Sequence, residues 1–165
     1  MLLLTASGAR AQAISSFARG PAGCRTVLDV GESATYRISS EVRGALSGVD
    51  GNCPAPAGPF DLGGSTAPAV EVVVRDADGR TIDLGPSRGR SYDTGSYAGA
   101  PVATVRLEPG RYEVEVTSAT AGAVVAIGPD PSAVARTQRT AAAVVAAAGV
   151  ASGLGAVALG RRRRR

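Results

Sequence analysis

The sequence contains no histidine, no lysine and no tryptophan, and it has only two cysteines. Serine and cysteine nucleophiles normally depend on a histidine or lysine base, and zinc sites need clusters of histidine or cysteine. A glycine-rich phosphate loop ending in lysine cannot occur, because the sequence has no lysine. Only carboxylate chemistry or calcium binding is left. We therefore predict that the protein is not an enzyme and has no catalytic residues, no metal site and no cofactor.

Aromatic residues are also scarce, because the 165 residues include two Phe and four Tyr. The net charge of +4 depends on the C-terminus, since residues 1–160 carry thirteen cations against fourteen acids. A nucleic-acid surface needs cations spread over one face, usually with aromatic rings for stacking. We therefore expect no nucleic-acid partner.

The C-terminal segment 140–160 contains no formal charge over twenty-one residues. Five arginines follow it: Arg161, Arg162, Arg163, Arg164 and Arg165. A helix of this length rises about 31 Å, close to the roughly 30 Å hydrocarbon core of a bilayer. An alanine-rich helix packed on a soluble domain is the alternative, but it should show a polar face at a spacing of about 3.6 residues. We predict a juxtamembrane and transmembrane helix over 130–160, which spans the lipid bilayer at about 140–160.

The arginines at 161–165 predict the orientation of this helix, because cytoplasmic flanks of membrane helices are enriched in basic residues. We expect a cytoplasmic C-terminus, with the preceding domain outside the cell membrane. Gly149 and Gly153 form a G-x-x-x-G motif within the span. This spacing lets two helices approach closely, so it fits a homodimer, but it also arises by chance in an alanine- and glycine-rich segment.

Residues 1–20 do not match a secretory signal well, because only Leu2, Leu3 and Leu4 precede polar residues and Arg10. Three interpretations stay open: the outer end of a longer first transmembrane helix, a poor cleavable signal, or an ordinary leader. We expect a single-pass protein for the sequence as it stands, and a two-pass protein under the first interpretation.

Residues 21–129 contain several segments in which polar and apolar residues alternate, the period of half-buried strands. In residues 34–42 the apolar side is Tyr36, Ile38 and Val42. The polar side is Thr35, Arg37, Ser39 and Glu41. Similar alternation covers 70–75, 81–84, 102–107 and 111–117, and a more apolar run covers 122–128. We predict a mainly β domain, an antiparallel jelly-roll or Ig-like β-sandwich of about six to eight strands, plus one long C-terminal transmembrane helix.

Two stretches rich in Gly, Ser and Pro, 43–68 and 85–101, are predicted to be loops too polar for the core. Tyr92 and Tyr97 lie in the second stretch, where they form a recognition edge or pack the loop onto the sheet. The Asp-Ala-Asp-Gly sequence at 76–79 is predicted to be a hairpin turn, because the remaining oxygens of a calcium loop are missing.

Cys24 and Cys53 enclose 28 residues. Outside the cytoplasm such a pair is normally oxidised, and the closed loop should stabilise the fold by roughly 3.5 kcal/mol. We predict a disulfide between them. The alternative is two unpaired, partly buried thiols.

The segment LEPGRYEVEV, residues 107–116, resembles the Pro-Gly-x-Tyr-x-Val-x-Val strand of many bacterial extracellular sandwich domains, including the jelly-roll modules called pre-peptidase C-terminal domains. Together with 17–42, 72–84 and 123–128 ahead of a hydrophobic helix, it is similar to a group of small, uncharacterised actinobacterial membrane proteins. The resemblance implies a β-sandwich between two transmembrane helices and supplies no activity.

These observations predict a membrane-anchored extracytoplasmic β-sandwich protein that is a non-enzymatic binding or structural component of the envelope. Its expected partners are the lipid bilayer and an envelope protein or glycan ligand. The alternative is an accessory subunit of an envelope enzyme or transporter complex.

Overall fold

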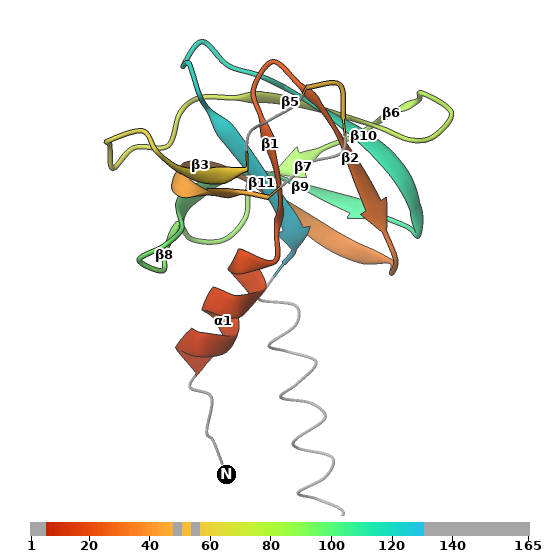
Figure 1. Ribbon diagram of the computed structural model, residues 1–165. Coiled ribbons are helices and arrows are strands. Elements are labelled where there is room, and N and C mark those ends of the chain that lie inside the picture. The colour runs from red at the N-terminus through yellow and green to blue at the C-terminus, as the bar shows by residue number, and fades with distance from the viewer. Residues whose placement is uncertain (1–5, 48–50, 54–56, 131–165) are drawn as a thin grey trace, which may run out of the picture. The chain divides into compact units, whose positions relative to one another are not determined.

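The computed structural model describes residues 6–47, 51–53 and 57–130 (Figure 1). The helix α1 (Ala6–Ser15) comes first, and eleven strands follow it. The strands are β1 (Ala18–Pro21), β2 (Arg25–Val30), β3 (Ala34–Leu46), β4 (Gly58–Asp61), β5 (Glu71–Arg75), β6 (Thr81–Ile82), β7 (Gly85–Pro86), β8 (Tyr92–Asp93), β9 (Ala98–Leu107), β10 (Gly110–Thr117) and β11 (Val124–Pro129).

The predicted C-terminal features lie outside the described residues. They are the span 140–160, the helix contact at Gly149 and Gly153, and the arginines at 161–165. Within the described ranges, no helix combines the length and the apolar character needed to cross a membrane.

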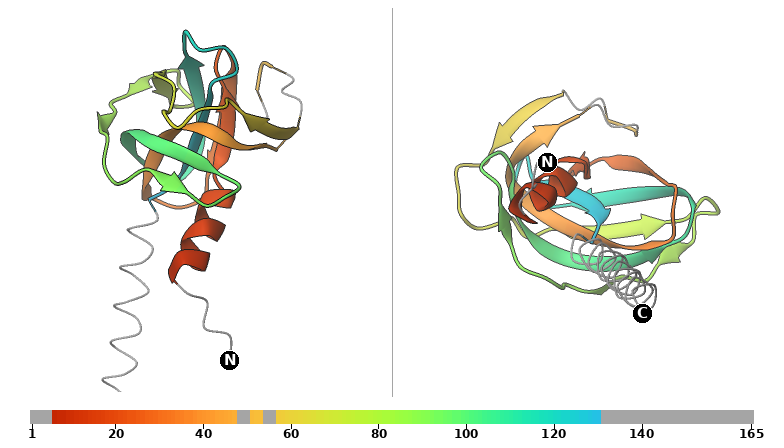
Figure 2. Two further views of the ribbon diagram at one scale, coloured as in Figure 1. Left: turned by 90° about the vertical axis from the view of Figure 1, so that its left-hand side faces the viewer. Right: turned by 90° about the horizontal axis from the view of Figure 1, so that it is seen from below.

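The strands form two antiparallel sheets (Figure 2). The larger has seven strands in the order β1-β11-β3-β9-β7, with β4 paired to β3 and β8 paired to β9. The smaller has four strands in the order β2-β10-β5-β6. One hydrophobic core takes side chains from both sheets, including Ile38, Val105 and Ile127 from the larger and Val74 and Val114 from the smaller. The domain is therefore mainly β, and the arrangement is consistent with the predicted β-sandwich.

The alternating pattern of β10 shows why these residues form a half-buried strand. Tyr112, Val114 and Val116 are buried, while Arg111 and Glu113 are exposed. The predicted turn at 76–79 also forms, because the Asp76 carboxylate accepts the backbone N–H of Asp78 and of Arg80 at 3.0 and 2.9 Å. Gly79 takes the positive φ of 79° that this turn requires.

The prediction of six to eight strands was too low, since eleven occur in the described residues. The additional strands are short and lack alternation. The stretch 43–68, predicted to be a loop, contains the end of β3 and all of β4, and 85–101 contains β7, β8 and the start of β9. The sandwich also begins at Ala18, within the predicted leader, because β1 pairs with β11.

The polar side of β3 differs from a solvated sheet face. Thr35 is exposed, but Arg37, Ser39 and Glu41 are buried, with 4%, 0% and 0% of their surface accessible. Glu41 and Arg37 each form an ion pair, and both pairs are described next.

Candidate functional site

A buried ion pair joins the chain that follows α1 to the centre of β3. Arg19 Nε lies 2.8 Å from Glu41 Oε2, and Arg19 Nη2 lies 2.9 Å from Glu41 Oε1. The two side chains are 2% and 0% exposed. Two parallel N–H···O bonds fix the relative position of both groups, and they offset the cost of removing two charges from water.

The same guanidinium closes the C-terminal end of α1. Arg19 donates to the backbone carbonyls of Ile14, Ser15 and Phe17 at 2.9, 3.3 and 2.9 Å. The last carbonyls of a helix have no partner within the helix, and a cation there is favoured by the helix dipole. Arg19 therefore ties α1 to the sheet through Glu41.

Two tyrosines complete this cluster. Tyr92 donates its hydroxyl to Glu41 Oε1 at 2.6 Å. Burial, followed by the Glu41 charge, raises the pKa of Tyr92 far above its usual value, so the phenol stays protonated and keeps donating. The ring of Tyr97 lies 4.0 Å from the Arg19 guanidinium carbon, which is a cation–π contact. We call Arg19, Glu41, Tyr92 and Tyr97 the buried cluster.

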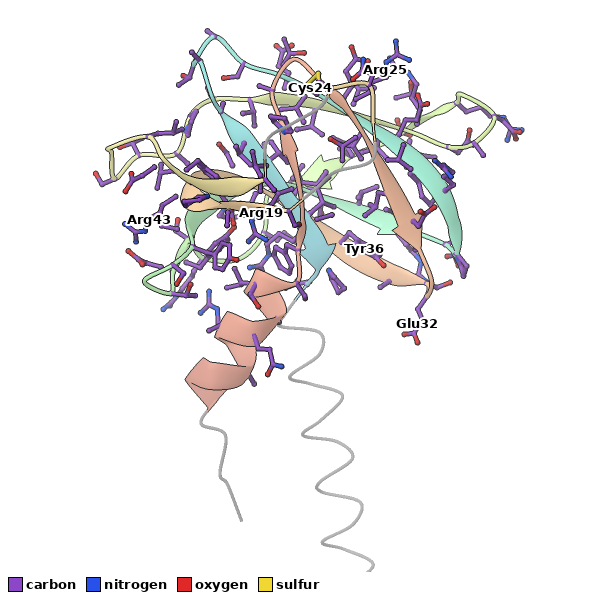
Figure 3. The ribbon with its side chains drawn as sticks, viewed as in Figure 1. Arg19, Cys24, Arg25, Glu32, Tyr36 and Arg43 are labelled. Carbon is purple, nitrogen blue, oxygen red and sulfur yellow. A yellow bond between two sulfur atoms is a disulfide. The ribbon has the colours of Figure 1, made fainter. Side chains whose placement is uncertain are left out.

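An open hollow of about 510 Å³ lies next to the buried cluster. We call it the β4 groove. Its lining comes from the end of β3, from β4 and from the turn after β8: Arg43, Gly44, Ala45, Pro59, Phe60, Asp61, Ser96 and Tyr97. In Figure 3, Arg43 projects outward from the domain, while Arg19 points inward above the end of α1.

Gly44 brings the groove against the buried cluster. A Cβ atom at this position would lie 2.9 Å from Glu41 Oε2 and 2.9 Å from the Phe60 ring. The absence of a side chain therefore lets the aromatic ring pack over β3, close to the buried carboxylate. Tyr97 belongs to both features, since it lines the groove and lies against Arg19.

The charged side chains of the groove are held by their own loops. Arg43 Nη2 donates to Asp93 Oδ1 at 2.9 Å, and the backbone N–H of Gly95 donates to the same oxygen at 2.9 Å. The Gly95 hydrogen bond, followed by Arg43, lowers the pKa of Asp93. Asp61 Oδ1 accepts the N–H of Gly63 at 2.8 Å. Both signs of charge are therefore presented in fixed positions.

A second ion pair, largely buried, lies nearer the start of β3. Arg37 Nη2 lies 2.5 Å from Asp130 Oδ1, and the two side chains are 4% and 17% exposed. The backbone N–H of Asp130 donates to the Thr35 carbonyl at 3.0 Å. Arg37 thus fixes the residue that follows β11, as Arg19 fixes the residues that precede β1.

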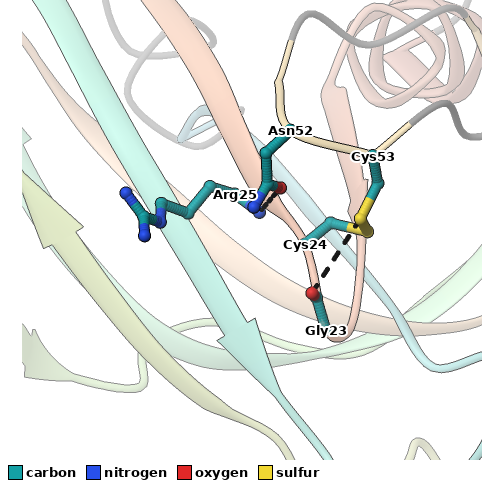
Figure 4. Close-up of a disulfide and its surroundings, with 5 residues drawn as sticks. All are labelled: Gly23, Cys24, Arg25, Asn52 and Cys53. Atoms are coloured by element: carbon teal, nitrogen blue, oxygen red, sulfur yellow. Dashed lines mark hydrogen bonds between the residues drawn. A yellow bond between two sulfur atoms is a disulfide. The ribbon is translucent and has the colours of Figure 1, made fainter.

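Cys24 and Cys53 lie at disulfide-bonding distance, with Cα atoms 5.6 Å apart, which confirms the predicted pairing (Figure 4). Next to them, Asn52 Oδ1 accepts the N–H of Arg25 at 2.7 Å, and the N–H of Asn52 donates to the Arg25 carbonyl at 3.1 Å. The bridge therefore ties residues 51–53 to the start of β2. It lies at the end of the domain opposite α1 (Figure 3).

The two tyrosines of the site were predicted from the sequence, and its other residues were not. For Tyr92 the packing interpretation is correct, whereas Tyr97 is half-buried and also lines the groove. Arg19, Glu41 and Phe60 were not identified. Isolated glycines inside β3 and β9 were the available signal, because glycine in a strand often marks a close approach by another group.

Metal-ligand clusters and enclosed cavities are the other kinds of candidate site in the described part of the chain. No group of three or more His, Cys, Asp or Glu side chains there could hold a metal ion. A second hollow, between the two sheets, has a volume of only about 10 Å³ and is lined mainly by apolar side chains such as Leu28 and Ile127. It has room for about one water molecule and none for a ligand.

No protein-family model, no curated protein and no solved structure matches this chain. A functional interpretation therefore depends on the geometry of the domain and on the sequence.

Proposed function

We propose that this chain is a membrane-anchored, extracytoplasmic β-sandwich protein of the cell envelope, jelly-roll or Ig-like in type, that binds a ligand and does not catalyse a reaction. The observation that carries the proposal is that the chain enters and leaves the sandwich at the same edge. β1 and β11 are antiparallel neighbours, with Ala18 opposite Ile127, so the start of one lies beside the end of the other. The Arg19–Glu41 and Arg37–Asp130 pairs fix both chain ends to β3.

This arrangement suits a domain held on a membrane. Nine residues separate Asp130 from the uncharged segment 140–160, which the five arginines follow. A connection of that length would keep this edge of the sandwich close to the lipid surface. The bridge between Cys24 and Cys53 supports an extracytoplasmic location, because disulfides persist mainly in oxidising compartments.

The β4 groove supports binding in preference to catalysis. Glu41, the most deeply buried acid nearby, is fully engaged by Arg19 and Tyr92. A general acid or base must reach the proton that it transfers, and this carboxylate has no accessible surface. The accessible groups of the groove are instead aromatic rings and fixed charges, which are the usual elements of a recognition surface.

The location can be tested by fractionating cells that express the full-length chain. We expect it in the membrane pellet after high-speed centrifugation and a high-salt wash, with release by detergent. A variant that ends at residue 139 is the matched control and should be released without detergent. Recovery of the full-length chain in the soluble fraction would overturn the proposal.

Orientation can be tested by labelling Cys24 and Cys53 with a membrane-impermeant maleimide in intact cells. We expect labelling only after reduction of the disulfide. Labelling that requires permeabilised cells would place the domain in the cytoplasm and contradict the proposal. Co-purification of a stable partner enzyme or transporter would favour the accessory-subunit alternative, while the homodimer through Gly149 and Gly153 stays a prediction.

A further inference from the structure

We propose that the β4 groove binds a neutral hexopyranose unit of a polysaccharide. This inference rests on the proposed function, because an extracytoplasmic domain is in contact with envelope glycans. The groove volume of about 510 Å³ lies within the roughly 300–1,000 Å³ of small-molecule sites. The evidence for the ligand class comes from the aromatic rings, the polar groups and the closed edge of β4.

The aromatic side chains are distributed unevenly. All six lie in the part of the chain that the structure describes, and four of them are buried: Phe17, Tyr36, Tyr92 and Tyr112. The two that remain partly exposed, Phe60 and Tyr97, both line the β4 groove. Flat apolar rings are complementary to the C–H faces of a sugar ring, and they can bury those faces with little loss of side-chain entropy.

Tyr97 is held in place before any ligand arrives. The Arg19 guanidinium lies over the Tyr97 ring. The backbone N–H of Tyr97 donates to Thr94 Oγ1 at 3.2 Å, and the backbone carbonyl of Tyr97 accepts the N–H of Thr94 at 2.9 Å. A ring that is already fixed loses little freedom when it binds. The buried cluster therefore acts as the support of this aromatic surface.

The polar groups of the groove favour a neutral ligand rich in hydroxyls. Arg43 can only donate hydrogen bonds and ionised Asp61 can only accept them, whereas each sugar hydroxyl does both. Asp61 and Asp93 are exposed at the rim and would repel an anionic chain, while Arg43 would repel a cationic one. A charged chain would therefore meet repulsion as well as attraction, whereas a neutral ligand with donors and acceptors close together meets no repulsion.

A peptide that adds a strand to the sheet fits less well. In the described residues β4 is a four-residue strand that pairs only with β3. The N–H of Leu62 donates to the Val42 carbonyl, so Leu62 and Val42 are a hydrogen-bonded pair. Such pairs alternate along an antiparallel ladder, so Pro59 and Ala45 are a non-hydrogen-bonded pair and the Pro59 nitrogen points away from β3, toward the open edge. Proline has no N–H to offer there, and proline at an edge prevents further strand pairing.

The test uses the full-length protein in a detergent without a sugar head group. Cellohexaose, maltohexaose and mannohexaose are added separately at about 10 mM, a level at which even weak binding is measurable. The NMR signals of ¹³C-labelled Phe and Tyr rings are recorded and assigned with Phe60→Leu and Tyr97→Phe. We expect at least one hexaose to shift the Phe60 and Tyr97 signals while those of buried Tyr36 and Tyr112 stay in place.

Variants separate the contributions. Phe60→Ala and Asp61→Asn should each weaken binding about tenfold, the loss expected for one stacked ring or one charge-assisted hydrogen bond. Asp83→Asn, which changes an exposed acid outside the groove, should leave binding unchanged. Far-UV circular dichroism confirms that each variant is folded.

The proposal is overturned if no hexaose shifts the Phe60 and Tyr97 signals, or if Phe60→Ala and Asp61→Asn bind as tightly as the parent. It is also overturned if a panel of unstructured peptides shifts those signals and the sugars do not. Failure here leaves the membrane location intact, since fractionation measures that separately. Sugar binding by a chain that fractionates as soluble would contradict only the location.

Discussion

The Arg19–Glu41 pair predicts a large, non-additive effect on stability. The Glu41 carboxylate has no accessible surface. Arg19→Met removes its counter-charge, and the Tyr92 hydroxyl is then its only described side-chain partner. It also removes the donor to the Ile14 and Phe17 carbonyls at the end of α1. Breaking a buried pair from one side typically lowers the free energy of unfolding by about 3–5 kcal/mol.

Glu41→Gln breaks the same pair from the other side and keeps the size of the side chain. Arg19 then remains buried with backbone carbonyls and the Tyr97 ring but no counter-charge. We expect a loss of about 3 kcal/mol. The double variant buries neither charge, so its loss should be smaller than the sum of the two single losses by roughly 2–3 kcal/mol.

Urea unfolding of the full-length chain in detergent, followed by far-UV circular dichroism, measures these free energies. The exposed pair of Arg25 and Glu113 is the matched control, with 3.7 Å between its charged atoms and side chains 55% and 49% exposed. Its double-mutant cycle should give a coupling below about 1 kcal/mol. Arg19 and Glu41 losses that add within about 0.5 kcal/mol, or single losses below about 1 kcal/mol each, would contradict the role assigned to this pair.

Three further predictions address other features of the domain. Replacing Cys24 and Cys53 together by serine should lower the free energy of unfolding by about 3.5 kcal/mol, and urea unfolding of the parent with and without reductant gives an independent value. The raised pKa of Tyr92 means that its stabilising contribution is complete below about pH 10, where unfolded tyrosine ionises, and is lost as pH rises above that value. Tyr92→Phe should therefore make stability fall less steeply above pH 10, and an unchanged slope would contradict the assignment. Gly128→Ala should lower the free energy of unfolding in urea by about 1–3 kcal/mol, because the new Cβ would overlap the Phe17 ring. Gly31→Ala is the control: no atom lies within 4 Å of its Cβ position, so the free energy of unfolding should change by no more than about 0.5 kcal/mol.

The two-residue periodicity predicted the longer strands, because it depends only on which side chains avoid water. Tyr112, Val114 and Val116 of β10 are an example, since they are buried as their pattern indicates. The disulfide was also predictable, given an oxidising location. Short strands such as β7 and β8 were not, because two residues form no pattern and their pairing depends on β9.

The candidate site was predictable only in part, for a physical reason. A polar residue on an alternating strand has the same pattern whether it faces water or a second polar layer. Arg37 and Glu41 therefore indicated a polar face, and only the tertiary structure brings Arg19 and Tyr92 over it. The helix α1 was not predictable from the sequence either, because it has no repeating apolar face. Its buried residues are Ile14, in the last turn, and Phe17, which follows the helix.

The adjacent ends of β1 and β11 determine how the domain would respond to a mechanical load. If the start of β1 and the end of β11 were pulled apart, the β1–β11 ladder would open from the Ala18–Ile127 pair, one residue pair at a time. Sheets loaded in this direction yield at lower force than sheets sheared along their strands, because their hydrogen bonds break in sequence. The contacts of Arg19 with Ile14 and Phe17, and of Arg37 with Asp130, lie just outside that residue pair, so both would carry load before the ladder opens.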